Sequence, residues 1–434
     1  MALKTQDEIL NKLGIAELNE MQKEAFNAIY SAPELVLLSP TGSGKTVAFL
    51  LPVITALDEN TEGVQVLILA PSRELAMQIE QVARDMGSGF KVNAVYGGRP
   101  MAKDKIDLQT TPSILIGTPG RVADHMRRES FDTSSIHTLV LDEFDKSLEI
   151  GFEEDMKEIV YALKRLDKKI LTSATDSLEL PKFLGIKQPE KLNFLNGVST
   201  KLQIRRIFSE SKDKLPALVK ALNHLGNAPG IVFINFRDAI DRVSDYLWEN
   251  NVSHGCFHGG MEQLDRELSL LKFRNGTHQL LLATDLAARG IDVPEISYII
   301  HYHLPSRAEE FTHRNGRTAR MNADGTAYVL TWDGEELPGF IDAPQVEKLT
   351  ENTSELSTIW TTLHITGGRK DKISKGDIAG LFFKKGTLSK EELGVIEIKQ
   401  SNSYVAVKTA VMRKVIPLVN NQRLKKKKVR VSAV

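Results

Sequence analysis

Short apolar runs rich in Val, Ile and Leu alternate with helical patterns along the first 350 residues of the chain. This alternation is typical of parallel sheets covered by helices, because strands that are buried on both faces carry apolar side chains in succession. Periodicity is weak and turn-forming residues are frequent at 193–202, which is the expected linker. The pattern predicts two α/β domains in tandem. Their expected strands are 35–38, 64–70, 91–96, 113–117, 136–141 and 169–173, followed by 203–208, 230–236, 279–284, 296–302 and 325–331, with helices at 213–226 and 237–250.

Beyond about residue 350 the order of elements changes to strand, helix, strand, strand, helix and strand. This is the order of a small ferredoxin-like domain. We expect these elements at 358–366, 375–385, 394–400, 404–409, 411–422 and 427–433. The expected domains are therefore 1–192, 203–350 and 357–434.

Charge is distributed unevenly, although 56 basic and 56 acidic residues give a formal net charge of zero. From Ser357 onward, 17 Lys and Arg stand against 5 Asp and Glu, a net charge of +12. Such a concentration, ending in four lysines at 425–428, is typical of a segment that binds a polyanion. A solvated charge run on the surface is the alternative.

The single cysteine and the N-terminal sequence indicate the cellular compartment of the protein. The single cysteine, Cys256, cannot form an internal disulfide, and the N-terminus lacks the basic flank and apolar run of a secretory signal. No apolar run approaches the roughly 18 residues that a membrane-spanning helix needs. We expect a cytoplasmic protein without a membrane partner.

A phosphate-binding loop is predicted at residues 39–46, which read Ser-Pro-Thr-Gly-Ser-Gly-Lys-Thr. The glycines let backbone N–H groups turn toward a phosphate, and the helix that follows adds its dipole. Lys45 would reach the β- and γ-phosphates, and Thr46 would bind Mg²⁺. The general pattern has glycine where this chain has Ser39. The expected nucleotide-binding residues of the loop are Thr41, Gly42, Ser43, Gly44, Lys45 and Thr46.

Two acids, Asp142 and Glu143, follow the apolar run at 136–141 and should lie at the carboxyl end of a central strand. Asp142 can hold the metal through its water shell, while Glu143 can orient and deprotonate the attacking water. Acids that close a strand are often only turn or capping residues. Their occurrence together with a phosphate-binding loop favours catalysis.

A third element, His-Arg-Asn-Gly-Arg-Thr-Ala-Arg at 313–320, is too distant along the chain to belong to the first domain. On a helix, His313, Arg317 and Arg320 would form one face. Arginines there could bind the γ-phosphate as charge develops in the transition state. A solvated basic face is the structural alternative.

Further short motifs occur in a fixed order with these three elements. They are Pro-Ser-Arg-Glu-Leu-Ala at 71–76, Gly-Gly at 97–98, Thr-Pro-Gly-Arg at 118–121, Ser-Ala-Thr at 173–175, Gln-Leu-Asp-Arg at 263–266, Ala-Thr-Asp at 283–285 and Arg-Gly-Ile-Asp at 289–292. The set resembles the DEAD-box RNA helicases of superfamily 2 over nearly all of residues 14–335. The resemblance implies two RecA-like domains, with Gln22 reading adenine and Asp292 near the ribose. It also implies that Ser173 and Thr175 couple hydrolysis to strand separation.

Several positions depart from the family pattern. Phe144 replaces the alanine of Asp-Glu-Ala-Asp, and Ala319 replaces a usual glycine. Leu18-Asn19 stand where Pro-Thr is common, and Thr5 stands where the family often has an aromatic that stacks on adenine. Adenine selectivity is therefore predicted less firmly than ATPase activity.

Contacts to RNA are expected on both α/β domains. Loops and helix N-termini just past the strands expose N–H donors to phosphates, so they would read the RNA backbone with little sequence preference. Taken singly, each such residue could be an ordinary turn residue. The candidates are Ser72, Arg73, Gly98, Thr118 and Arg121 in the first domain and Gly260, Arg266 and Thr284 in the second.

The C-terminal segment resembles the RNA-binding domain of the bacterial DbpA type of DEAD-box protein, particularly across 376–382 and 425–431. It is similar to an RNA-recognition motif (RRM) in which residues 400–407 leave only Tyr404 as a base-stacking aromatic. Recognition would then rely on basic loops and helix ends. The resemblance implies ribosomal RNA as the target and ribosome assembly as the role. The candidate RNA-binding residues are Lys370, Lys372, Lys384 and Lys385.

We therefore expect an α/β ATP-dependent RNA helicase with a small RRM-like α+β domain, using ATP and Mg²⁺ and acting on RNA, not DNA, as a monomer. The resemblance implies that ATP draws the two α/β domains together around bent RNA, and that hydrolysis reopens them. Two alternatives stay open: an ATP-gated RNA clamp or scaffold with little unwinding, and a DNA helicase built on the same fold.

Overall fold

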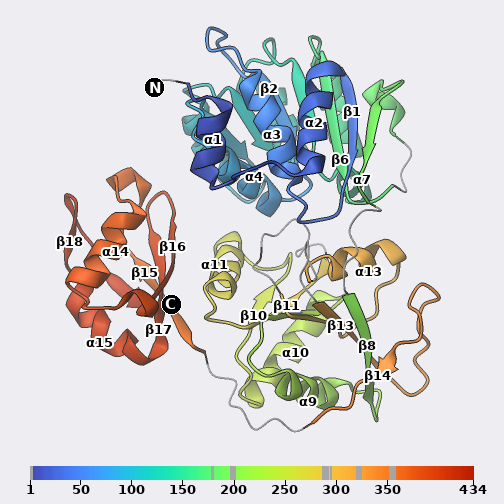
Figure 1. Cartoon of the computed structure of the whole chain (residues 1–434), viewed down its shortest axis with the longest axis vertical. Helices are drawn as coiled ribbons and strands as arrows, with labels where there is room; N and C mark the ends of the chain where they lie inside the picture. Colours follow the sequence, from blue (N-terminus) through green and yellow to red (C-terminus); the bar gives the residue numbers. More distant parts are fainter. Residues whose placement is uncertain are drawn as a thin grey trace. The chain divides into compact units, whose positions relative to one another are not determined.

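The computed structural model describes residues 3–176, 180–195, 202–285, 293, 296–318, 325–350 and 358–434. The described residues form two compact units, one up to residue 195 and the other from residue 202 onward (Figure 1). Each unit is described by itself. Within these ranges, no helix is both long enough and apolar enough to span a membrane.

The first unit is built on one sheet of seven described strands, all parallel, in the order β3-β4-β2-β5-β6-β1-β7. The six strands expected from the sequence are confirmed to within about two residues. β7 was not expected because its side chains are largely exposed and form no apolar run. The strands are β1 Glu34–Leu38, β2 Val66–Leu69, β3 Val92–Val95, β4 Ile114–Gly117, β5 Thr138–Leu141, β6 Lys168–Ser173 and β7 Glu190–Asn193.

Helices cover both faces of this sheet, and α2 and α3 lie together beside β1 on one of them (Figure 1). Along β2, Val66 and Ile68 pack with α1 to α4, whereas Leu67 and Leu69 pack with α5 to α8. Successive residues of a strand point to opposite faces, so a strand buried on both sides must be apolar throughout. The helices are α1 Gln6–Leu13, α2 Glu20–Ser31, α3 Lys45–Thr55, α4 Arg73–Met86, α5 Met101–Leu108, α6 Pro119–Arg127, α7 Phe144–Glu149 and α8 Glu153–Ala162.

The second unit begins with another parallel sheet of seven described strands, in the order β10-β11-β9-β12-β13-β8-β14. The five expected strands are present, although the one expected at 230–236 ends at Phe233. The short strands β10 and β14 and the helix α11 were not expected. The elements are β8 Leu202–Ser209, α9 Leu215–Leu225, β9 Gly230–Phe233, α10 Arg237–Glu249, β10 Gly255–Phe257, α11 Gln263–Arg274, β11 Leu280–Ala283, β12 Tyr298–His301, α13 Ala308–Asn315, β13 Gly325–Trp332 and β14 Gln345–Val346.

The same unit ends in a small domain whose four described main strands form an antiparallel sheet, β16-β17-β15-β20, with α14 and α15 packed on one face. The last expected strand, 427–433, is wrong over its first half. Lys425 adopts a left-handed turn conformation (φ 55°), so residues 427–428 pair back onto 423–424 and only Val431–Ala433 joins the sheet. The elements are β15 Trp360–Ile365, α14 Lys375–Lys384, β16 Leu393–Ile398, β17 Ser403–Lys408, α15 Thr409–Val419, β18 Arg423–Leu424, β19 Lys427–Lys428 and β20 Val431–Ala433.

The expected fold class, two RecA-like parallel-sheet domains followed by a small α+β domain, is confirmed. β7 ends at Asn193 and β8 begins at Leu202, while residues 196–201 of the expected linker lie outside the described residues. The domain boundaries stay predictions.

Candidate nucleotide and RNA sites

The predicted phosphate-binding loop follows β1 and leads into α3, whose first residue is Lys45. The Lys45 side chain is 8% exposed, and its Nζ donates to the carbonyl oxygens of Ser39 and, at 2.8 Å, Pro40. Ser39, where the general pattern has glycine, is buried and its hydroxyl donates to Ser43 Oγ at 2.5 Å. The lysine is thus folded onto its own loop, and a bound phosphate would replace these carbonyl acceptors.

Gln22 is held against the same loop. Asn19 caps α2, and Asn19 and Gln22 exchange backbone-to-side-chain hydrogen bonds in a capping box. Their amide groups then donate to loop carbonyls, Asn19 Nδ2 to Ser43 at 3.2 Å and Gln22 Nε2 to Gly44 at 3.3 Å. Asn19, a departure from the family pattern, therefore contributes a donor of its own. Thr5, where an adenine-stacking aromatic is often found, instead caps α1.

The acids Asp142 and Glu143 follow β5, two strands from β1 with β6 between them. Asp142 is 3% exposed, and burial raises its pKa, although a hydrogen bond from the Thr172 hydroxyl and the charge of Lys45 oppose that rise. Glu143 has left-handed backbone angles (φ 46°, ψ 51°), which are uncommon for a residue other than glycine and point to a functional constraint. Its N–H donates to Thr172 Oγ1 at 3.2 Å. Thr172 thus fixes both acids, a role that the sequence alone did not indicate.

The two residues expected to couple hydrolysis to strand separation lie beside the last acid of the Asp-Glu-Phe-Asp motif. The Thr175 hydroxyl donates to Asp145 Oδ2 at 3.2 Å, and Ser173 Oγ accepts from the Thr175 N–H at 2.9 Å. Burial raises the pKa of Asp145, which Lys146 opposes. Phe144 is 3% exposed and packs in the hydrophobic core on the α5–α8 face of the sheet, which accommodates its larger side chain.

The expectation that His313, Arg317 and Arg320 form one face of a helix is wrong. Helix α13 ends at Asn315 with Gly316 as its C-cap, and Arg317 lies in the turn that follows. Arg317 is nevertheless buried, at 4% exposed. Arg320 lies outside the described residues, as does Asp292.

A residue that sequence reasoning missed, Arg314, contacts three other segments of the second unit. It is 1% exposed and forms a forked pair with Asp285, at 2.6 Å from Nε and 2.5 Å from Nη2. Nη2 also donates to Asn235 Oδ1 at 2.7 Å, and Nη1 donates to the His303 carbonyl at 2.8 Å. Its position between His313 and Arg317 was a signal, but sequence spacing could not identify its partners.

In the first unit, the expected RNA-binding residues lie at helix N-termini and in one glycine turn. Ser72 caps α4, and the Arg73 guanidinium lies so close to Gly98 (φ 81°) that a Cβ there would be 2.3 Å from Nη1. Thr118 caps α6 without a side-chain bond. Arg121 donates to the buried Asp104 at 2.8 Å, so its observed contacts position α6 against α5.

In the second unit, Arg266 is 8% exposed and its guanidinium lies 5.1 Å from the centre of the Phe257 ring. Thr284 directly follows β11. Gly260 lies under the side chain of Arg237, the first residue of α10. Phe236, which precedes Arg237, is 67% exposed. Neither Phe236 nor Arg237 was among the RNA-binding residues expected from the sequence.

The four lysines proposed for the C-terminal domain lie on its surface. All of them are exposed, two around the short turn Arg369–Asp371 and two at the end of α14. Lys425 pairs with Asp377 at 3.0 Å. Hydrogen bonds from Ser374, and after them this pair, hold the pKa of the Asp377 carboxyl down to about 2.

Comparison with known proteins decides the family. Residues 19–182 match the DEAD/DEAH box helicase model, residues 213–322 the helicase conserved C-terminal domain, and residues 362–433 the DbpA RNA binding domain. The chain is 31% identical to ATP-dependent RNA helicase DbpA of Escherichia coli, over 97% of this chain and 95% of that protein. The chain belongs to the DEAD-box ATP-dependent RNA helicases. The helicase is also 30% identical to ATP-dependent RNA helicase DbpA of Bacillus subtilis, over 98% of this chain and 96% of that protein.

Solved structures agree with this family. The helicase is similar to Mss116 bound to ssRNA and UDP-BeF, with a TM-score of 0.69 and 26% identity over 76% of this chain and 73% of that one. Its fold is also that of Saccharomyces cerevisiae Dbp5 bound to RNA and ADP BeF3 (TM-score 0.69, 23% identity, 80% and 94% covered). The predictions of an RNA-stimulated ATPase and of RNA as its partner are confirmed at the level of the family.

The residues around the phosphate-binding loop fit Mg²⁺. Thr46 and Asp142 offer the oxygen ligands that this ion prefers, and the described residues include no cluster of three or more His, Cys, Asp or Glu that could hold a metal. Mg²⁺ typically keeps several waters and is held by one or two protein groups plus substrate phosphates. When bound, it would neutralise the developing charge of the phosphoryl group.

Proposed function

We propose that this helicase remodels ribosomal RNA during ribosome assembly, as a cytoplasmic monomer whose C-terminal domain selects the RNA. The observation that carries the proposal is the separation of charge along the chain: +12 from residue 357 onward, and hence −12 before it. A net positive charge concentrated in one small domain favours binding of a polyanion there. The match of residues 362–433 to the DbpA RNA binding domain supports RNA as that polyanion.

We propose the following roles at the nucleotide. Lys45 and Thr46 bind the phosphates and the ion, together with Asp142, and Gln22 reads adenine beside the loop. Glu143 accepts a proton from the attacking water. Its left-handed backbone supports a functional role for this residue. His313, Arg317 and Arg320 act on the γ-phosphate, and Asp292 lies near the ribose. Binding of ATP and single-stranded RNA to the same closed state would make each tighten the other's affinity.

The coupling of hydrolysis to RNA is proposed to run through the polar contacts between β5 and β6. Thr172 contacts both Asp142 and Glu143, and Thr175 contacts Asp145. A shift of the Glu143 backbone on hydrolysis would therefore displace the loop after β6. This assigns the Ser-Ala-Thr segment a positioning role, not a catalytic one.

The proposal is tested by measuring ATP hydrolysis with ribosomal RNA fragments, generic RNA duplexes and DNA. Ribosomal RNA is expected to give half-maximal stimulation at a concentration at least ~10-fold below that of generic RNA, and removal of residues 357–434 should abolish that difference while generic RNA still stimulates. Equal stimulation by all RNAs in the full chain would reject the targeting role. A strand-displacement assay with Glu143→Gln as the inactive control separates unwinding from clamping.

A further inference from the structure

The sheet of the C-terminal domain has one face covered by its own helices and one face that they leave open. Leu363 packs with α14 and α15. Its neighbours on β15, Thr362 and His364, point the other way, because alternate residues of a strand face opposite sides. His364 lies directly opposite Tyr404 of β17. In an RRM this open face is the one that stacks RNA bases.

Thr362 is fully buried although it points away from the core of its own domain. Asn275 Nδ2 donates to its hydroxyl at 3.2 Å, and the Thr277 hydroxyl lies 2.7 Å from it. Asn275 is itself only 4% exposed. Both partners lie in the turn that follows α11 of the second α/β domain. Buried polar groups need partners, and the Thr362 hydroxyl finds its partners in Asn275 Nδ2 and the Thr277 hydroxyl across the contact.

Shape and charge extend this contact. Gly276 has a left-handed conformation (φ 73°), and a Cβ there would come within 3.2 Å of the Trp360 indole. The glycine thus permits both the turn and the close approach of the ring. Arg274, the last residue of α11, pairs with Glu397 of β16 at 3.4 Å. The open sheet face therefore contacts a helix end, a tight turn and an ion pair.

A second ion pair lies further along α11, where Lys399 and Glu267 are 3.8 Å apart. Burial raises the pKa of Tyr404, and the charges of Glu267 and Glu397 add to the rise. Both carboxylates are paired across the contact, Glu397 with Arg274 and Glu267 with Lys399. Tyr404, which the sequence left as the remaining base-stacking candidate, therefore lies beside ion pairs that join this face to α11.

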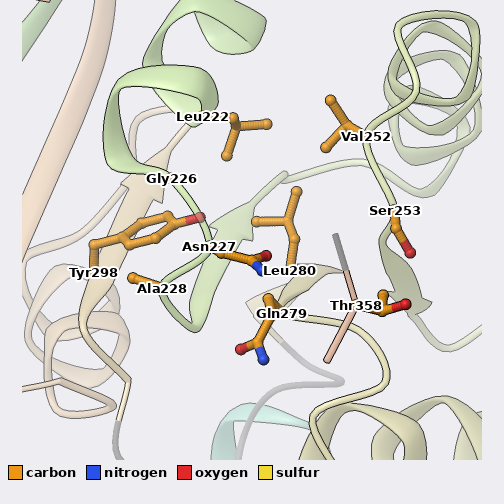
Figure 2. A pocket seen from close by; sticks show the side chains of 10 residues that line it. All are labelled: Leu222, Gly226, Asn227, Ala228, Val252, Ser253, Gln279, Leu280, Tyr298 and Thr358. Carbon is orange, nitrogen blue, oxygen red and sulfur yellow. The ribbon is translucent and has the colours of Figure 1, made fainter. Parts of the chain in front are cut away.

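The chain enters the C-terminal domain near the amino ends of the strands of the second parallel sheet, whereas the RNA candidates lie near their carboxyl ends. Thr358 lines a pocket together with Ser253, Gln279 and Tyr298 (Figure 2). Those three residues lie at the amino ends of β10, β11 and β12, whereas Thr284 follows the carboxyl end of β11. The pocket thus belongs to the junction between the two domains and is separate from the RNA candidates.

We propose that the C-terminal domain works while docked, with the open face of its sheet closed against α11 and the turn at 275–277. RNA is then held by the lysine-rich surface on the helical side, which includes Lys384 and Lys385. This second part rests on the RNA-targeting role proposed above. Because α11 also carries Arg266, docking fixes the distance between RNA held by this domain and the RNA candidates of the second α/β domain.

The docked arrangement is tested by a disulfide between Thr277→Cys and Thr362→Cys in a Cys256→Ser background. Two hydroxyls 2.7 Å apart are within reach of a disulfide after conversion to thiols. The matched control is Thr277→Cys with Thr361→Cys, because the Thr361 hydroxyl bonds Thr409 on the other side of the strand. We expect rapid oxidation of the first pair and little of the second. Equal oxidation of both pairs, or none in either, would overturn docking.

The crosslinked protein then shows whether docking is the working state. RNA-stimulated ATP hydrolysis should stay within about twofold of the same protein after reduction. A loss of tenfold or more that reductant restores would mean that the domain must leave this position to work.

RNA affinity tests which surface binds. His364→Ala and Tyr404→Ala should change the dissociation constant for a structured RNA less than about twofold, while Lys384→Glu with Lys385→Glu should raise it at least ~10-fold at low salt. The opposite ranking would show that the sheet face binds RNA. If the lysine variants bind normally and no RNA is preferred, the targeting role fails while the crosslink result still stands.

Discussion

Replacing Arg314 with methionine tests whether the buried contacts of this residue organise the second unit. The guanidinium makes a forked pair with Asp285 and donates to Asn235 and to a carbonyl, all while 1% exposed. Methionine retains length and apolar packing but no donor. Asp285 would then keep its charge in a largely buried place without a partner.

Loss of one partner from a buried ion pair typically costs about 3–5 kcal/mol. For a domain of roughly 150 to 250 residues, each kcal/mol lowers Tm by about 2–4 °C, so the expected decrease is roughly 6–20 °C. Arg314→Lys should fall between methionine and the wild type, because lysine keeps the charge but not the planar fork. RNA-stimulated ATP hydrolysis should fall as well, since Thr284 and Arg317 adjoin the disturbed segments.

Urea unfolding followed by tryptophan fluorescence isolates the effect. All three tryptophans, Trp248, Trp332 and Trp360, lie in the second unit, so the signal does not report on the first. Arg307→Lys, an exposed arginine that precedes the same helix, is the matched control and should change the midpoint little. If Arg314→Met unfolds at the wild-type urea concentration, the polar contacts of Arg314 do not stabilise the second unit, and the reasoning is refuted.

Three further outcomes are expected. Asp104→Asn should destabilise the first unit by about 3 kcal/mol, because Arg121 loses its buried charged partner. It should also weaken the stimulation of ATP hydrolysis by RNA more than basal hydrolysis. An RNA titration identical to that of the wild type would contradict this. Thr172→Val should slow hydrolysis at least ~10-fold with little change in ATP affinity, since Asp142 loses a donor; equal kcat would contradict it. Acidification from pH 7 to 5 should destabilise the second unit. Burial lowers the pKa of His301 to about 3, so below an unfolded pKa of about 6.5 the unfolded chain binds a proton that the native state does not. The loss is about 2 kcal/mol at pH 5, and His301→Asn should reduce it in urea titrations.

The sequence predicted the interior of both parallel sheets well because burial on both faces leaves an uninterrupted apolar run. Strands at the edges carry no such run. β7 has mostly exposed side chains, and β14 consists of two exposed residues, so neither differs from a loop in pattern. The end of α13 was missed for a local reason, since the helical spacing of its basic residues was extended through Gly316.

The candidate site shows a similar division. Residues within one contiguous motif could be predicted, because a phosphate-binding loop or an acid pair is formed by a few residues that are adjacent in sequence. Partners distant in sequence could not. Arg314 meets Asp285 across 29 positions and Asn235 across 79, and Thr172 meets Asp142 across 30. Only the sheet order, which places the ends of these strands side by side, identifies such pairs.

These long-range pairs have a consequence for the effect of substitutions on activity. Thr172 and Arg314 each act within a single unit, where burial makes their hydrogen bonds costly to break. Substituting them should therefore lower stability and catalysis together. Arg237 is different, because its side chain is 64% exposed and pairs, at 4.0 Å, with Asp238, which is 99% exposed. Its replacement by alanine should leave the unfolding midpoint unchanged and alter only the RNA concentration needed for half-maximal stimulation. A variant that separates the two readouts in this way marks a residue that contacts RNA, whereas one that lowers both marks a residue that positions the site.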